Sequence, residues 1–389
     1  METPAPISPP SRVLMGPGPS DVAPAVLRAL SAPTIGHLDP AFLDVMDEVR
    51  GMLRQVFGTD HELTLPMSGT GSSGMEACFA NLIAPGDRVL VCVNGVFGGR
   101  MTDVARRCGA EVTVAEAPWG RAMDPDDVRR AAAGHSYKLL CLVHAETSTG
   151  VLQDLSPFRG LAYELGAMLL VDAVTSLGGV PVNVDTHGLD AVYSGTQKCL
   201  SCPPGLAPLT LSDRALDALR SHPGPVQSWY LDLTMITRYW SEERVYHHTA
   251  PVNMIYALHE ALRAVLEESL EARFARHRTN AAALRAGLAA MGLELPVPPA
   301  ERLDPLTLVR IPEGADDATT RRMLLDRYGL EIGGGLGDFK GKAWRIGLMG
   351  TSCTRRNVVL CLTALADVLR AQGVRVADDP VAAANGAWA

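Results

Sequence analysis

Two residues of opposite charge, Asp172 and Lys198, follow successive apolar segments and are of the types that perform acid–base or covalent chemistry. Asp172 ends the apolar run of "LLVDAVTSLGG", and Lys198 follows the apolar run of "AVYSGTQKCLSCPPG". In a parallel sheet the carboxyl ends of neighbouring strands lie at one edge, where ligands collect. We therefore expect the carboxylate and the amine to face the same ligand. A turn-capping aspartate and a surface lysine are the alternatives that these two segments leave open.

The stretch "SGTGSSGMEA" (residues 68–77) is an expected anion site, because it follows an apolar strand and opens a helix. Small residues let the backbone approach a ligand, and the free N–H groups and the dipole at a helix start favour a phosphate. Gly69, Gly71 and Gly74 also match the dinucleotide motif G-x-G-x-x-G. That motif needs an acid at the end of the next strand, and this strand ends at Asn94. A phosphate is therefore the first interpretation, with a dinucleotide or a plain tight turn as alternatives.

A lysine, an acid and a phosphate cradle at one sheet edge are together the groups that a pyridoxal phosphate site requires. The lysine forms a Schiff base with the cofactor, the acid keeps the pyridine nitrogen protonated, and the cradle holds the phosphate. The protonated ring then accepts electrons from the α-carbon of the substrate. This combination favours pyridoxal-phosphate chemistry over the other uses of a reactive lysine.

Composition and cysteine usage restrict the class of protein. The chain of 389 residues has a net charge of −8, which argues against nucleic-acid or anionic-membrane partners, since both need a basic face. Most of its eight cysteines lie in apolar stretches such as "VLVCV", as expected of buried thiols in a cytoplasmic protein. Cys199 and Cys202 form a C-x-x-C that is too small for a zinc ribbon, although a redox role stays open. The adjacent His247 and His248 are poorly placed to share one ion, so no metal is expected.

The elements that position these residues alternate between strand and helix through the first part of the chain. Near-continuous apolar strands require a sheet that is covered on both faces, and the alternation predicts a mostly parallel α/β sheet. Ser20 is expected to cap the first of the helices. The predicted strands are 63–68, 88–93, 138–144, 167–173 and 189–195, and the predicted helices are 21–30, 40–57, 72–84, 98–109 and 156–166.

A smaller α+β unit is expected after a long helical pattern over residues 252–291 and a proline-rich break. It contains predicted strands 306–311 and 343–350, predicted helices 316–328 and 354–372, and a glycine-rich loop at 333–337. The whole chain is thus expected to divide into an N-terminal arm (1–20), a large domain (21–270), a small C-terminal domain (271–375) and a loose tail (376–389).

The order of the motifs resembles that of the class V, fold-type I aminotransferases, near the alanine–glyoxylate and serine–pyruvate aminotransferases. The similarity runs from about residue 14 to about residue 370, and such an ordered series is far more specific than one motif. This resemblance implies the fold-type I architecture, pyridoxal 5′-phosphate as cofactor and transamination as the reaction. The matching stretches are "MGPGPSDVAP", "IGHLDPAF", "SGTGSSGMEA", "PGDRVLV", "HAETSTGVLQDL", "LLVDAVTSLGG", "SGTQKCLSCPPG", "YHHTAPV" and "RIGLMG".

The resemblance also implies a role for individual residues. Lys198 would bind the cofactor covalently, and Asp172 would pair with its pyridinium nitrogen. Arg345 would bind the substrate carboxylate, because a planar guanidinium matches a carboxylate with two hydrogen bonds. The other implied contacts are Thr70, Gly71, Ser72 and Gln197 at the phosphate, Thr147 at the phenolic oxygen, Phe97 on the ring face, Tyr246 and Thr249 at the phosphate from a second subunit, and Gly36 and His37 at the substrate.

The activity implied is a ping-pong transamination in a homodimer with shared active sites. Arg345 is the one evident carboxylate-binding arginine, which favours L-alanine or L-serine as amino donor and glyoxylate or pyruvate as acceptor. A second arginine such as Arg238 or Arg244 would weaken this inference if it reached the site. The alternatives are related transaminases of ureidoglycine, aminoethylphosphonate or pyridoxamine, and an NAD-dependent oxidoreductase.

Overall fold

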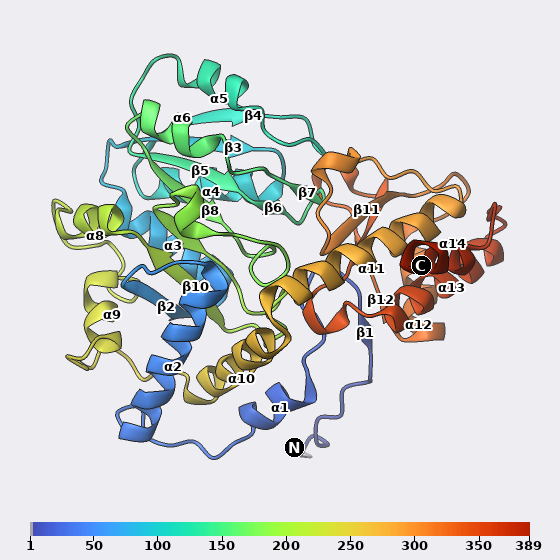
Figure 1. Ribbon diagram of the computed structural model, residues 1–389, viewed down its shortest axis with the longest axis horizontal. Coiled ribbons are helices and arrows are strands. Elements are labelled where there is room, and N and C mark those ends of the chain that lie inside the picture. The colour runs from blue at the N-terminus through green and yellow to red at the C-terminus, as the bar shows by residue number, and fades with distance from the viewer. Residues whose placement is uncertain (1–2) are drawn as a thin grey trace.

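A seven-stranded sheet forms the centre of the large lobe of the molecule (Figure 1). The computed structural model of the chain describes residues 3–389. The strands of the sheet are β2 (Leu63–Ser68), β3 (Arg88–Val93), β4 (Glu111–Glu116), β5 (Leu139–Val143), β8 (Met168–Asp172), β9 (Ala191–Tyr193) and β10 (Leu206–Leu211). Their order is β2-β10-β9-β8-β5-β3-β4.

The pairing is parallel from β9 through β4 and antiparallel on both sides of β10, so the sheet is mixed but mostly parallel. The predicted fold class is therefore confirmed. β4 and β10 were not predicted from the sequence. β4 is a partly exposed edge strand with a glutamate at each end, and β10 contains Pro208 directly after a proline–glycine turn. Both features weaken the apolar pattern that identifies a strand.

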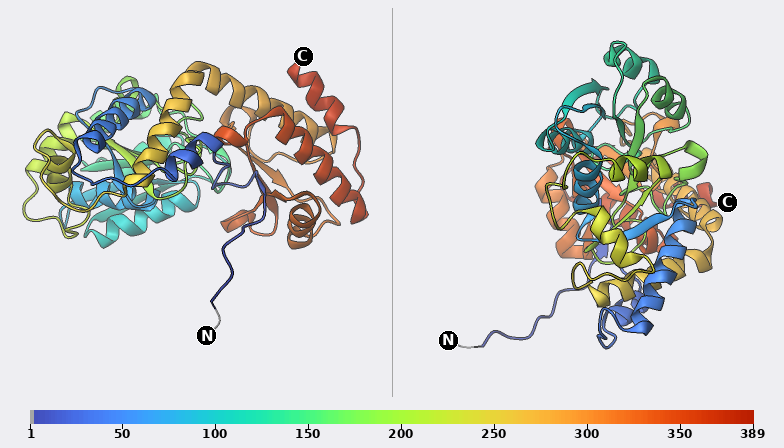
Figure 2. Two further views of the ribbon diagram at one scale, coloured as in Figure 1. Left: turned by 90° about the horizontal axis from the view of Figure 1, so that it is seen from below. Right: turned by 90° about the vertical axis from the view of Figure 1, so that its left-hand side faces the viewer.

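Helices cover both faces of this sheet (Figure 2). In α2 the buried residues Phe42, Met46, Val49, Leu53 and Phe57 recur every three or four positions, and the helix ends at Gly58 in the left-handed conformation. The helices of the large lobe are α1 (Pro24–Leu30), α2 (Pro40–Phe57), α3 (Gly71–Leu82), α4 (Val96–Arg107), α5 (Pro125–Ala132), α6 (Phe158–Glu164), α7 (Val184–His187), α8 (Asp213–Arg220), α9 (Leu233–Trp240) and α10 (Val252–Glu268). The short strands β6 (Ala145–Glu146) and β7 (Val151–Leu152) form a hairpin after β5.

A second hydrophobic core lies in the small lobe, around a three-stranded antiparallel sheet. Trp344 and Ile346 on the central strand are fully buried there. The strands are β11 (Leu306–Arg310), β13 (Gly333–Gly334) and β14 (Ala343–Gly347), and the helices are α11 (Leu270–Ala290), α12 (Asp317–Tyr328), α13 (Arg355–Ala371) and α14 (Pro380–Trp388).

The expected loose tail over 376–389 is wrong, because most of it folds as α14. Asp379 caps this helix, Ala384 is fully buried in the small-lobe core, and the indole of Trp388 donates to Asn280 on α11 (3.1 Å). The segment "PVAAANGAW" carries too weak an amphipathic pattern to identify a packed helix. Its contacts with α11 and α13 provide the stability that its sequence does not signal.

The long helical pattern over 252–291 is two helices. α10 packs against α2 in the large lobe, and α11 packs against α13 and α14 in the small lobe (Figure 2). They are separated at Ser269, whose φ is 65° and whose side chain accepts from the Ala272 amide to cap α11. This break lies next to the predicted boundary between the domains.

The N-terminal arm contacts both lobes. β1 (Val13–Leu14) pairs in parallel with β12 (Leu330–Glu331) of the small lobe, and Met15 lies in its core. Ser20 does not cap α1, which begins after Ala23. Instead, the hydroxyl of Ser20 donates to the carbonyl of Lys198 (2.7 Å), so the arm is attached to the large lobe beside the candidate lysine.

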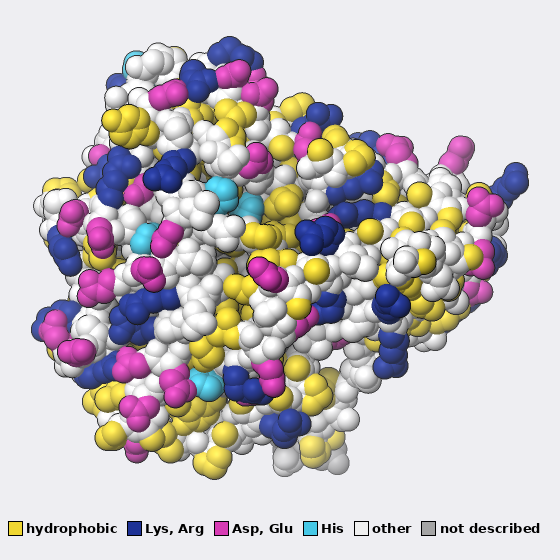
Figure 3. Space-filling view, in the orientation of Figure 1, with side chains coloured by type: hydrophobic (Ala, Val, Ile, Leu, Met, Phe, Trp, Pro, Cys, Tyr) yellow, Lys and Arg dark blue, Asp and Glu magenta, His cyan; other side chains and the backbone are white. Residues whose placement is uncertain are grey.

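Two surface properties are relevant to possible partners. On the face shown in Figure 3, acidic and basic side chains are interspersed. Among residues 3–389, no helix combines the length and the apolar character needed to cross a membrane.

Candidate active site

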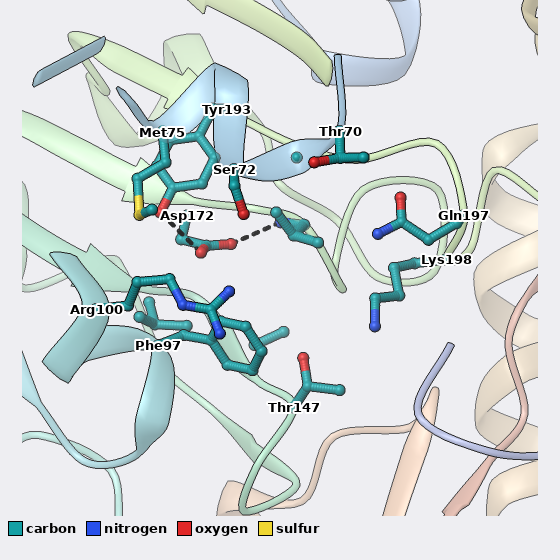
Figure 4. Close-up of a pocket in the computed structure, with 14 residues that line it drawn as sticks. Thr70, Ser72, Met75, Phe97, Arg100, Thr147, Asp172, Tyr193, Gln197 and Lys198 are labelled. Carbon is teal, nitrogen blue, oxygen red and sulfur yellow. Dashed lines mark hydrogen bonds between the residues drawn. The ribbon is translucent and has the colours of Figure 1, made fainter. Parts of the chain in front are cut away.

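A cavity opens at the carboxyl edge of the large sheet, between the start of α3 and the loop that carries Lys198 (Figure 4). It brings together segments that are far apart in the sequence, as expected for the carboxyl ends of parallel strands. The predicted site residues that line it are Thr70, Gly71, Ser72, Phe97, Thr147, Asp172, Gln197 and Lys198.

Asp172 is buried at the end of β8 and is held by two hydrogen bonds. Its carboxylate accepts from the Val174 amide (2.8 Å) and from the Tyr193 hydroxyl (2.8 Å). Tyr193 lies opposite Asp172 in the register between β9 and β8, and it was not predicted as a site residue. Burial raises the pKa of Asp172 to about 6, while both hydrogen bonds and the charge of Lys198 oppose this rise. With this pKa, the carboxylate is mostly ionised at pH 7 and can pair with a cationic group of a ligand.

Replacing Tyr193 with phenylalanine removes only the hydroxyl that donates to Asp172. Since this bond stabilises the carboxylate, we expect the pKa of Asp172 to rise by about one further unit. The acidic limb of the pH–rate profile then moves to higher pH. Tyr163→Phe, at a tyrosine that is 87% exposed, is the control and leaves the profile unchanged. An identical profile for both variants would show that the Tyr193 hydroxyl does not support charge on Asp172.

Lys198 is buried in the loop after β9, with only 9% of the residue exposed. Its ammonium donates to the carbonyl of Pro17, and a Cβ at Gly18 would lie 2.6 Å from the Lys198 Nζ. The N-terminal arm therefore forms one wall around the amine. Burial, followed by the charge of Arg345, lowers the pKa of Lys198 to about 8. A lower pKa increases the fraction of the neutral, nucleophilic amine at physiological pH.

The start of α3 supplies the anion cradle that the sequence predicts. Thr70 precedes the helix without a side-chain cap, and the helix begins at Gly71. Amide groups at a helix start lack the usual partner four residues earlier, although that of Ser73 donates to the Thr70 carbonyl (2.7 Å), and the dipole there favours negative charge. Gln197 lines the cavity together with this turn, and its side-chain amide has N–H groups that can donate to a phosphate oxygen. These groups fit the phosphate of a ligand.

The opposite wall of the cavity is formed by α4 and the hairpin after β5. Phe97 and Arg100 point into the cavity from α4, with the Arg100 guanidinium 4.9 Å from the centre of the Phe97 ring (Figure 4). Thr147 shares a hydrogen bond with Thr175 (2.5 Å). Arg100 was not predicted as a site residue. Its position one helical turn after Phe97 is the signal that identifies it once α4 is known.

Arg345 approaches the site from the small lobe and is buried on β14. Its guanidinium donates to the carbonyl of Gly334 (2.8 Å) and to the carbonyl of Thr147 (3.2 Å). Burial lowers the pKa of Arg345 to about 10. The side chain does not line the cavity itself, but it contacts Thr147, which does, and its charge acts on Lys198.

Besides Arg345, four predicted residues lie outside the cavity of this chain. Tyr246 is 57% exposed and its ring lies 5.3 Å from that of His37, while Thr249 is also exposed. Gly36 precedes His37 in the same exposed loop. Their place on the surface is compatible with contacts to a second subunit. The two arginines considered from the sequence as a second carboxylate anchor are engaged elsewhere. Arg238 pairs with Glu243 (3.0 Å), and Arg244 pairs with Asp47 (2.5 Å).

Cys199 and Cys202 are both buried next to Lys198. Burial raises the pKa of each thiol to about 12, so both are protonated at neutral pH and are weak nucleophiles. The thiol of Cys199 donates to the Thr175 carbonyl (3.3 Å). Within residues 3–389, His, Cys, Asp and Glu side chains form no group of three or more suited to a metal ion.

Comparison with known proteins assigns the chain to a family. The Aminotransferase class-V family model matches residues 22–337. The chain belongs to the class V aminotransferases. Enzymes of this family with the fold-type I architecture depend on pyridoxal 5′-phosphate, so this aminotransferase is a pyridoxal-phosphate enzyme.

Three solved structures are similar to this aminotransferase over nearly their whole length. An alanine–glyoxylate aminotransferase from Nostoc sp. is 47% identical with a TM-score of 0.93, covering 95% of this chain and 98% of that one. A ureidoglycine–glyoxylate aminotransferase from Bacillus subtilis is 42% identical with a TM-score of 0.96, covering 98% and 99%. A pyridoxamine–pyruvate aminotransferase from Mesorhizobium loti is 31% identical with a TM-score of 0.91, covering 96% of each chain.

The residues of this aminotransferase fit the cofactor of its family. The start of α3 and the side-chain N–H group of Gln197 suit a phosphate, and the buried Asp172 suits a protonated ring nitrogen. Lys198, with its lowered pKa, suits covalent attachment. The assignment replaces the dinucleotide interpretation of residues 68–77.

Proposed function

We propose that this aminotransferase moves the amino group of a small neutral amino acid, L-alanine or L-serine, to glyoxylate or pyruvate by a ping-pong mechanism. The observation that carries the proposal is the position of Arg345, a buried guanidinium that contacts a cavity residue close to Lys198. Arg100 lies on the other side of the cavity, beside Asp172 and Phe97 (Figure 4). The charge of Arg345 acts on Lys198 and that of Arg100 acts on Asp172, so one guanidinium is placed near the reacting amine, which matches a substrate with one carboxylate. The similarity to the alanine–glyoxylate aminotransferase from Nostoc sp. supports the same choice.

Each of three residues of the chain has a separate role in the proposed reaction. When bound, pyridoxal phosphate supplies an electron sink that stabilises negative charge at the substrate α-carbon. Lys198 is placed to remove and return the α-proton, because a pKa near the working pH suits a general acid–base group. Asp172 holds the proton of the ring nitrogen in place, and Arg345 orients the substrate by its carboxylate.

A donor screen with purified holoenzyme tests this function. We expect L-alanine and L-serine to bleach the visible absorption of the bound cofactor, and glyoxylate or pyruvate to restore it. The similarity to the ureidoglycine–glyoxylate aminotransferase of B. subtilis makes (S)-ureidoglycine the second candidate donor. Aminoethylphosphonate and pyridoxamine complete the panel. If only one of these three compounds changes the spectrum, the proposed substrate class is wrong and the family assignment stands.

Replacing Arg345 with lysine tests the carboxylate anchor. Lysine keeps the charge but loses the two parallel donors of the guanidinium. We expect the KM for the amino donor to rise about 10- to 100-fold, as for the loss of a charge-assisted hydrogen bond. Arg310→Lys on the neighbouring strand β11 is the matched control, because Arg310 pairs with Glu294 at the surface. Equal KM values in both variants would remove Arg345 from the substrate site.

We further propose that the enzyme is a homodimer whose subunits share active sites. Exposed apolar and aromatic side chains gather around Tyr246, and exposed patches of this kind mark interaction surfaces. His248 connects this patch to the end of β2, three residues before α3, since its imidazole bonds to the hydroxyl of Ser68 (2.8 Å). The exposed members of the patch are Leu38, Trp229, Tyr230, Val245 and Tyr246.

Complementation between two inactive variants tests the shared site. Lys198→Ala and Tyr246→Ala are mixed, unfolded and refolded together with cofactor. A mixed dimer contains one site with an intact Lys198 and an intact Tyr246 from the other chain. Random reassociation then restores about a quarter of the wild-type activity in a symmetric dimer. Each variant refolded alone is the control, and absence of any recovery in the mixture contradicts the shared site.

The cytoplasmic location expected from the sequence stays a prediction. Cell fractionation with an antibody to the protein would test it.

A further inference from the structure

Glu146 is a fully buried carboxylate directly before the cavity residue Thr147. Its two oxygens accept three hydrogen bonds, from the Phe97 amide (3.1 Å), the Ser148 amide (3.0 Å) and the Ser148 hydroxyl (2.5 Å). Burial raises its pKa, while the bonds from Ser148 and Phe97 oppose the rise. A buried acid with so many donors requires an explanation, because burial of a charge is costly unless a structure uses it.

The hydrogen bonds show that Glu146 and Ser148 cap helix α4 from a distant part of the chain. α4 begins after Gly95, which has no side chain to satisfy the first amide groups of the helix. The Val96 amide donates to the Ser148 hydroxyl (3.0 Å), and the Phe97 amide donates to Glu146. The positive end of the helix dipole stabilises the carboxylate there.

Gly95 is needed for this cap. A Cβ at position 95 would lie 2.4 Å from the carboxyl carbon of Glu146 and 2.5 Å from the Ser148 hydroxyl, which is closer than non-bonded atoms approach. By contrast, a Cβ at Gly99, one turn later in the same helix, would meet no atom within 4 Å. The two glycines therefore provide a matched pair of sites within one helix.

Glu146 also joins α4 to the segment that holds Arg345. α4 carries Phe97 and Arg100 into the cavity, while the residue after Glu146 presents the carbonyl that accepts from Arg345 (3.2 Å). The negative charge of Glu146 also raises the pKa of Arg345, against the effect of burial. Glu146 is thus joined to the segments of both Phe97 and Arg345, directly to the Phe97 amide and through the adjacent Thr147 to Arg345.

We propose that Glu146 is a positioning residue, which fixes the start of α4 and the ring of Phe97 against the segment that holds Thr147 and Arg345. The inference rests on the proposed function, in which Phe97 contacts the cofactor and Arg345 the substrate. An amide in place of the carboxylate would turn one N–H group toward the donors of Phe97 or Ser148. The start of α4 then shifts, and the ring of Phe97 moves with it.

The test compares Glu146→Gln, Gly95→Ala, Ser148→Ala and the control Gly99→Ala as holoenzymes. The visible circular dichroism of the bound cofactor reports its fixed, asymmetric surroundings, and a titration gives the cofactor dissociation constant. We expect Glu146→Gln and Gly95→Ala to lose most of the dichroism and to bind the cofactor about 10- to 100-fold more weakly, as for lost charge-assisted hydrogen bonds. The KM for the amino donor rises as well, and Gly99→Ala matches the wild type.

The possible results separate the inference from the proposed function. If Glu146→Gln and Gly95→Ala melt at lower temperature but keep the wild-type dichroism and dissociation constant, Glu146 is only structural and the inference is wrong. Ser148→Ala removes one acceptor and one donor, so it gives a smaller loss of dichroism even where the other variants fail to fold. An unchanged Ser148→Ala signal in that case also overturns the inference. Failure of the wild type to respond to any amino donor would instead contradict the proposed function.

Discussion

Substitution of Lys198 by alanine reduces transamination by at least about 10²–10⁴-fold, the range expected for loss of a general acid–base group. The loss has two causes. The amine that attaches the cofactor is missing, and among residues 3–389 no other lysine lines the cavity to move the α-proton. Single-turnover absorbance after addition of L-alanine measures the remaining rate. Lys340→Ala, at an exposed lysine of the small lobe, is the control and retains full activity.

Reduction of the wild-type holoenzyme with borohydride adds an independent measurement. The peptide that contains Lys198 gains the mass of the reduced cofactor, whereas Lys198→Ala gains none at this peptide. An unmodified Lys198 peptide from cofactor-saturated enzyme, or a variant with undiminished turnover, would show that another residue performs the covalent step.

Asp172→Asn is the second substitution with a large expected effect. It lowers the activity of the holoenzyme and raises the stability of the apoenzyme. Asparagine keeps the shape of the side chain and still accepts from the Val174 amide, but it lacks the charge that holds the ring nitrogen protonated. We expect kcat to fall about 10²–10³-fold, the range for loss of one preorganised electrostatic contact. Steady-state kinetics with saturating cofactor measures this loss.

The apoenzyme of the same variant is expected to be more stable than the wild type at neutral pH. The pKa of Asp172 is about 6 in the folded chain and ~3.9 in an unfolded one. Between these values the folded state binds the extra proton, so the stability of the wild-type apoenzyme falls as pH rises from ~4 to ~6. At pH 7 this pKa difference of about two units lowers the free energy of unfolding of the wild-type apoenzyme by about 3 kcal/mol. Asp172→Asn removes this destabilisation.

Urea unfolding of both apoenzymes at pH 4 and pH 7 measures this difference. The variant gains stability at pH 7 and little at pH 4, since at the lower pH Asp172 is protonated in the folded chain and about half protonated in the unfolded one. Asp326→Asn, at an exposed aspartate, shows no gain at either pH. A variant less stable than the wild type at pH 7 would mean that the ionised Asp172 stabilises the apoenzyme.

Contacts between remote segments account for the site residues that the sequence analysis missed. Tyr193 belongs to an apolar strand in the sequence, and only the register between β8 and β9 places its hydroxyl on Asp172. Ser20 precedes a helix and was expected to cap it, but it donates to Lys198 instead. In both cases the side chain has a plausible local role and a different partner in the folded chain.

The sequence alone determined the reactive pair, the phosphate turn and the strand–helix alternation, because each depends on neighbouring residues or on a short repeat. Asp172, Lys198 and residues 68–77 meet at one sheet edge as a consequence of parallel strand order. The tertiary structure alone decided that Glu146 caps α4, that Pro17 and Gly18 enclose the lysine, and that the last residues form α14. These features join segments tens to hundreds of residues apart, and such contacts leave no periodic pattern in either segment.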